Sequence, residues 1–162
     1  MSTSAYLHGI GGWLRLLIVG LTILGPISGF GRITSDLQSA EEQFPILISS
    51  TGWQQYKQFS WYVFWIATAI SISAGYRLWK LHVADSVRFA IIGLWLVGPV
   101  SCLGQFAVTW FAFGTRAQAA VPEMLSALVA SIIGAGIWTA YLHRSTRVKN
   151  TYVAMSYAKL EA

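Results

Sequence analysis

Charged residues are scarce in this chain of 162 residues. It has 11 Lys and Arg and 6 Asp and Glu, so that 10% of its residues are charged, whereas about 25% is usual for a soluble domain. The charges are also clustered, and they leave four uncharged stretches of the length that a membrane-spanning helix needs: residues 16–31, 58–76, 89–115 and 124–142. This pattern excludes a soluble enzyme and a disordered protein.

The four stretches predict an all-α integral membrane four-helix bundle that forms a single transmembrane domain over residues 1–162. The segment between the first two helices, about 33–51, is the one sizeable external connection, and Asp36, Glu41 and Glu42 make it acidic. The expected elements are helices at about 12–33, 52–79, 88–113 and 124–143 and a basic tail at 144–162.

The distribution of Lys and Arg predicts the orientation of the bundle. Short cytoplasmic loops and ends carry an excess of these residues. Seven of them lie in the second connection and the tail, against three at the opposite ends of the helices. We therefore expect both termini in the cytoplasm. The seven are Arg77, Lys80, Arg88, Arg144, Arg147, Lys149 and Lys159, and the three are Arg32, Lys57 and Arg116.

Residues that carry chemistry are almost absent. Cys102 is the single cysteine, which excludes a disulfide within the chain and a cysteine pair for a metal. The histidines His8, His82 and His143 lie at or beyond helix ends, where they cannot ligate a haem within the bundle. We expect no catalytic residue, no metal and no cofactor. Since the basic residues lie between and after apolar segments, we also expect membrane lipid rather than nucleic acid as their partner.

A repeat relates the first and third helices. Residues 15–32 match residues 88–105 without a gap at eight of 18 positions, in the pattern R-x-x-I-x-G-L-x-x-x-G-P-x-S-x-x-G. Both copies enter the membrane from the same side, so the repeat predicts two parallel helical hairpins related by an axis along the membrane normal. It also pairs Arg15 with Arg88 at the cytoplasmic entrance, where both side chains reach the headgroups.

The repeat contains a Gly-Pro pair in each helix, Gly25-Pro26 and Gly98-Pro99. Each proline removes a backbone donor and crowds the preceding turn, so each helix should kink. Two interpretations stay open. The kinks shape the packing of four helices, or they line a cavity in which Gln105 is the best polar anchor.

Small residues recur every four positions in the helices and predict close helix packing. The last helix carries two such ridges side by side, enough for one neighbour within the chain and one partner. The ridges are Gly25 and Gly29; Ala67, Ser71 and Gly75; Ser126, Ala130 and Gly134; and Ala127, Ser131 and Ala135. In the tail, Arg144, Arg147 and Lys149 surround an apolar face, as in a helix that contacts lipid or a partner protein.

Two motifs carry a family resemblance. The chain opens with Gly11-Gly12-Trp13-Leu14 and closes with Tyr141-Leu142-x-x-Ser145-x-Arg147-Val148-Lys149-x-Thr151-Tyr152-Val153. Together they resemble a family of small bacterial inner-membrane proteins defined only as a domain of unknown function. The resemblance implies four spans with both ends in the cytoplasm and a place in the bacterial inner membrane, but it implies no activity and no ligand.

These features predict a non-enzymatic membrane protein that acts by packing against other membrane protein subunits, as an accessory or assembly subunit. The support is the lack of chemistry together with the small-residue ridges and the basic tail. The alternative is a small carrier or binder of an apolar or lipid-like molecule, held between the kinked first and third helices.

Overall fold

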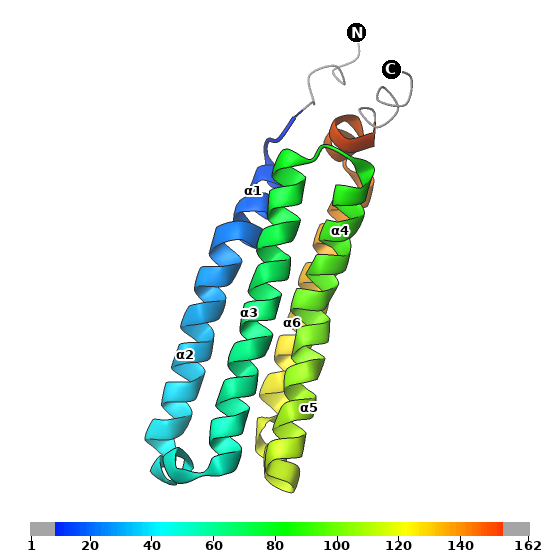
Figure 1. The fold of residues 1–162 in the computed structure, drawn as a ribbon. Coiled ribbons are helices and arrows are strands. Elements are labelled where there is room, and N and C mark those ends of the chain that lie inside the picture. Colours follow the sequence, from blue (N-terminus) through cyan, green and yellow to red (C-terminus); the bar gives the residue numbers. More distant parts are fainter. Residues whose placement is uncertain (1–8, 154–162) are drawn as a thin grey trace.

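The computed structural model describes residues 9–153, with all of their side chains except those of residues 116, 119 and 153. This part of the chain is helical almost throughout, and its four long helical stretches run up and down side by side (Figure 1). The elements are α1 (Trp13–Val19), α2 (Gly25–Gln43), α3 (Thr51–Lys80), α4 (Ala84–Trp95), α5 (Ser101–Phe113), α6 (Val121–Arg144) and α7 (Thr146–Val148).

Short turns of other helix types connect these elements. A π-helical turn at Gly20–Leu24 joins α1 to α2, and another at Leu96–Val100 joins α4 to α5, so each pair forms one continuous stretch. Turns of 3-10 helix at Pro45–Ser49 and Gly114–Ala120 lead into α3 and α6. A third π-helical turn, Lys149–Val153, follows α7.

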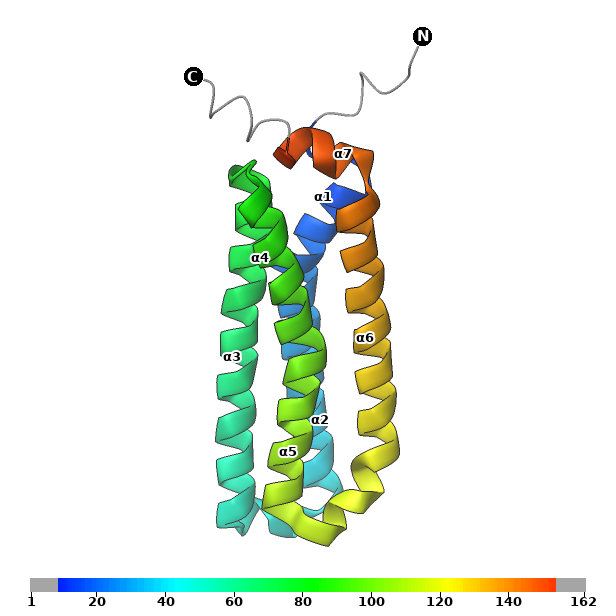
Figure 2. The same cartoon turned by 90° about the vertical axis from the view of Figure 1, so that its right-hand side faces the viewer.

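Three of the long stretches have the length and apolar composition of a membrane span, which makes the described chain a multi-pass membrane protein by these criteria. They are Trp13–Gln43, Ala84–Phe113 and Val121–Arg144. The stretch that does not meet the criteria is α3, which carries polar and aromatic residues along much of its length. It packs against both α1–α2 and α4–α5, and α6 packs against α4–α5 (Figures 1 and 2).

The first helix is longer than the sequence predicts. Its expected end lies near Ile33, with an external connection at 33–51, but α2 continues to Gln43. Two side-chain pairs one turn apart support the added turns, Arg32 with Asp36 and Gln38 with Glu42. The helix ends where Pro45 disfavours helical backbone at the residue before it, and Phe44 accordingly has φ −133° and ψ 77°.

The other expected boundaries differ by a few residues. The helix expected at 52–79 is Thr51–Lys80, the one at 88–113 begins at Ala84, and the one at 124–143 is Val121–Arg144. The tail expected at 144–162 turns at Ser145 and continues as α7 and the π-helical turn after it. Its residues from 154 onward, including Lys159, lie outside the described part of the chain.

A π-helical turn lies at each Gly-Pro pair. In such a turn an amide donates to the carbonyl five residues earlier, and Pro26 has no amide to give to Leu21. The hydroxyl of Ser71 on α3 donates to the Leu21 carbonyl instead, at 2.7 Å. In the other turn, the hydroxyl of Ser101 donates to the carbonyl of Leu96 at 2.8 Å. Only the first hydroxyl replaces a missing amide, because the Leu96 carbonyl also accepts from the backbone amide of Ser101.

The buried core lies toward the end where the first and last described residues meet. Its side chains come from every long stretch and from the tail, so this end is closed by packing. Figure 2 shows α7 lying across this end of the helical stretches. The members are Leu14, Leu17, Ile18, Leu21, Ala74, Leu78, Ala90, Leu142, Val148 and Tyr152.

Candidate functional site

The two family-like motifs meet in space at this closed end. The amide of Gly9 donates to the hydroxyl oxygen of Thr151 at 3.1 Å, across 142 positions of sequence. The guanidinium of Arg147 lies against Gly11 and Gly12. We call residues 9–14 and 145–152 together the terminal clasp. It joins the beginning and the end of the described chain.

The glycines make room for Arg147. A Cβ atom at Gly11 would lie 2.5 Å from Arg147 Nη1, and one at Gly12 would lie 3.3 Å from the same atom. Gly12 also has φ +57°, a backbone conformation that favours glycine. The turn directly before α1 therefore favours glycine at Gly12, whereas a Cβ atom at Gly11 would displace the end of the Arg147 side chain.

Tyr152 anchors the other half of the clasp. Its side chain is fully buried, its hydroxyl donates to the carbonyl of Leu78 on α3, and its ring stacks on His82 at 5.7 Å between centroids. Burial raises the pKa of Tyr152 to about 12 from its ordinary 10.0. The phenol therefore stays neutral through the physiological range and remains a hydrogen-bond donor.

The remaining motif residues divide between the core and the surface. Leu14 and Val148 are buried and belong to the core, while Trp13 is exposed and packs edge-on against Trp138 at 6.4 Å. Ser145 is half-buried and its carbonyl accepts from the amide of Lys149 at 3.1 Å. Part of the motif thus holds the fold, and part faces outward.

The predicted lipid or partner contacts lie at this end, most of them on the surface. Arg15, Arg144 and Lys149 are exposed. Arg88 is also exposed and lies 3.9 Å from Asp85, one turn away on α4. Arg147 is half-buried because it covers the two glycines.

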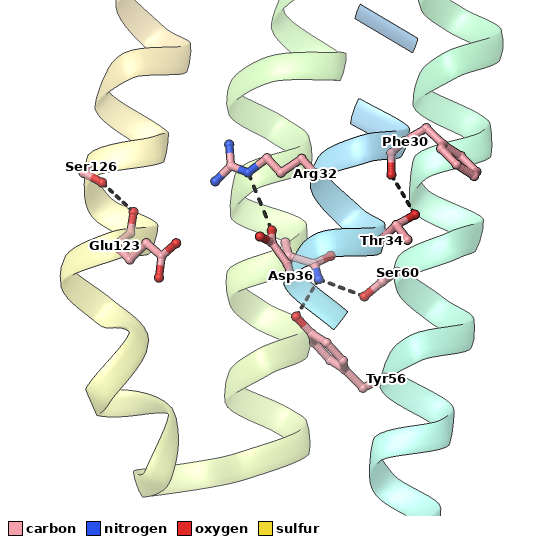
Figure 3. A network of polar contacts seen from close by, with 9 residues as sticks. Phe30, Arg32, Thr34, Asp36, Tyr56, Ser60, Glu123 and Ser126 are labelled. Atoms are coloured by element: carbon pink, nitrogen blue, oxygen red, sulfur yellow. Dashed lines mark hydrogen bonds and ion pairs between the residues drawn. The ribbon is translucent and has the colours of Figure 1, made fainter. Parts of the chain in front are cut away.

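Gln105 forms a polar contact between α5 and α3. Its side-chain amide donates to Tyr56 Oη at 2.8 Å and to Ser60 Oγ at 2.9 Å, the two α3 residues labelled in Figure 3. Both amide hydrogens are therefore used within the chain. This arrangement is the interhelical hydrogen bonding that polar residues provide in membranes.

A second polar cluster near Gln105 does not follow from the sequence pattern. Glu41 on α2 accepts from Trp53 Nε1 at 2.8 Å and from Lys57 Nζ at 2.7 Å, both on α3. The Trp53 ring stacks on Tyr56, and Phe113 packs against both rings. We call Glu41, Trp53, Tyr56, Lys57 and Gln105 the distal lock. Because the sequence pattern places Glu41 in a loop, its contact with α3 could not be foreseen.

Two shallow hollows of the described chain lie away from the Gly-Pro pairs. One of about 440 Å³ is lined by Phe106, Ala107, Trp110 and Phe111, and one of about 300 Å³ by Gly12, Trp13 and Leu16. Neither Gly-Pro pair lines them. Gly98 instead packs against α6, because a Cβ atom added to Gly98 would lie 3.6 Å from the Cβ atom of Ser131. Pro99 is buried.

These observations define a multi-pass, all-helical membrane protein whose two described chain ends are joined. Within residues 9–153 no group of three potential metal ligands comes together. The chain belongs to the family described as protein of unknown function (DUF2569), whose model matches residues 7–153. That range includes both halves of the clasp. No curated protein and no solved structure matches the chain.

Proposed function

We propose that this protein is a non-catalytic interaction subunit of a larger complex in the bacterial inner membrane. It spans the membrane four times, as α1–α2, α3, α4–α5 and α6. The uncharged run at 58–76 supports a span for α3, since 19 residues rise about 28 Å along a helix, close to the thickness of the hydrocarbon core.

The charge pattern supports a cytoplasmic location for the clasp end. Basic residues gather there, and such residues favour the cytoplasmic side. They are Arg15, Arg77, Lys80, Arg88, Arg144, Arg147 and Lys149. We also propose that α1–α2 and α4–α5 arose by duplication, because both contain a π-helical turn at the Gly-Pro pair and both lead away from the clasp end (Figure 1).

The observation that carries the proposed function is a ridge on α6 that stays exposed among the described residues. Of its two small-residue ridges, the one with Ser131 and Ala135 packs against the π-helical turn of α4–α5. On the other, Ser126 and Ala130 are exposed, and a Cβ at Gly134 would meet nothing within 4 Å. Small residues allow a second helix to approach closely, so this ridge can receive a helix of a partner subunit.

The test is purification in mild detergent followed by native mass spectrometry. Ala130→Ile fills the ridge and should remove a stoichiometric partner subunit that the unaltered protein retains. Ala107→Ile is the matched control, since Ala107 is also exposed but its neighbours at four positions, Leu103 and Phe111, are bulky. Equal retention in both variants, or no partner with the unaltered protein, contradicts the proposal.

A further inference from the structure

The outer side of the clasp combines a hollow with positive charge. The hollow of about 300 Å³ is lined by Gly12, Trp13 and Leu16. Arg15 lies one helical turn after Gly12, and its backbone amide donates to the Gly12 carbonyl at 3.1 Å. Arg147 Nη1 would lie 3.3 Å from a Cβ atom at Gly12. Residues with positive charge from both ends of the described chain therefore lie next to Gly12, at the edge of the hollow.

The surroundings of the hollow contain both positive and apolar groups. Ion pairs among the described residues involve Arg32, Lys57 and Arg88, so no carboxylate of this part of the chain pairs with Arg15 or Arg147. Trp13 is 66% exposed and Leu16 is 47% exposed. A ligand that fits this surface has an anionic group and an apolar part.

We propose that the hollow binds one anionic phospholipid of the adjoining leaflet. Arg147 and Arg15 hold the phosphate, for which the planar guanidinium is well suited, and an acyl chain lies along Trp13 and Leu16. A soluble anion would use the charges and leave the apolar half of the surface uncovered. The site does not depend on a protein partner, so it stands apart from the proposed function.

The experiment is a titration of delipidated protein in detergent with phosphatidylglycerol or phosphatidylcholine, followed by native mass spectrometry. We expect one phosphatidylglycerol to bind in preference to phosphatidylcholine. Arg15→Gln and Arg147→Gln should each weaken that binding about fivefold, the effect of one basic residue near an anionic membrane surface. Because Arg15 is exposed, its substitution tests lipid binding without changing the packing of the clasp. Arg147 also packs on Gly11, so its substitution changes that packing as well.

Lys80→Gln is the control, because Lys80 is an exposed basic residue at the same end but on α3. It should leave phosphatidylglycerol binding unchanged. An equal loss with Lys80→Gln would show general attraction to the basic end and overturn the site. Displacement of the lipid by millimolar glycerol 3-phosphate would show that the site binds a soluble anion. That result would contradict the assignment of the site to a phospholipid. Unchanged binding with Arg15→Gln would also overturn the proposal.

Discussion

The two ends of the molecule are held together by different means. At the terminal clasp, segments far apart in sequence are joined by a fully buried tyrosine, by Gly9 with Thr151, and by Arg147 on a glycine pair. At the distal lock, one buried ring, that of Trp53, lies beside partly exposed polar side chains such as Lys57 and Glu41, which are 30% and 25% exposed. Burial therefore dominates at the clasp, whereas hydrogen bonds between partly exposed groups make up a larger share of the distal lock.

This difference indicates which end tolerates change. A buried aromatic side chain contributes several kcal/mol through packing, whereas partly exposed polar contacts contribute about 1 kcal/mol or less. We therefore expect the clasp to be the more sensitive end. Most residues of the two family-like motifs lie at the clasp, while the distal lock contains none of them.

The largest effect is expected for Tyr152→Ala. Removing a fully buried ring should lower the free energy of unfolding by about 3 to 5 kcal/mol, as other large aromatic truncations do. Backbone amides at 9–14 should then exchange hydrogen faster, as measured by mass spectrometry. Trp53→Ala at the other end is the control and should leave the exchange of those amides unchanged. Faster exchange at 9–14 in both variants would show that the two ends are not independent.

Alkaline pH should weaken the clasp next most strongly. The pKa of Tyr152 is raised to about 12 in the fold against 10.0 ordinarily, so the unfolded phenol ionises first. The stabilisation is complete below pH 10 and is lost as the pH rises toward 12, by about 2 to 3 kcal/mol. Unfolding measured from about pH 8 to 12 should show this loss in the unaltered protein, and Tyr152→Phe should lack it. An identical pH profile for both would contradict the assignment.

A smaller effect is expected for Glu41→Gln in the distal lock. The amide oxygen can still accept from Trp53, but the charge that pairs with Lys57 is lost, so we expect a small loss of stability for this partly exposed pair. Asp36→Asn is the matched control. Its partner Arg32 lies 3.6 Å away and both side chains are 64% exposed, so the cost should be near zero. A greater loss with Asp36→Asn would reverse our ranking of the two pairs.

The sequence predicts the helical fold well because long uncharged runs leave few alternatives. The predicted end of the first helix is wrong. The residues after Ile33 are polar, as is typical of a loop, but several of them have a high helix propensity. The family-like motifs lie near the two ends of the described chain, but their meeting in space depends on how the helices turn back. Only the packed structure shows that Gly11 makes room for Arg147.

The smallest effect is expected for Gln105→Leu, which tests whether the distal lock depends on its interhelical amide. The substitution removes the bonds to Tyr56 and Ser60, and such bonds contribute about 0.6 kcal/mol on average in membranes. Thr109→Val is the control, because its hydroxyl donates to the Gln105 carbonyl within the same helix. We expect a small loss of stability for the first variant and less for the second. A loss of several kcal/mol with Gln105→Leu would place the polar contacts on a par with the buried clasp, and the contrast between the two ends would fail.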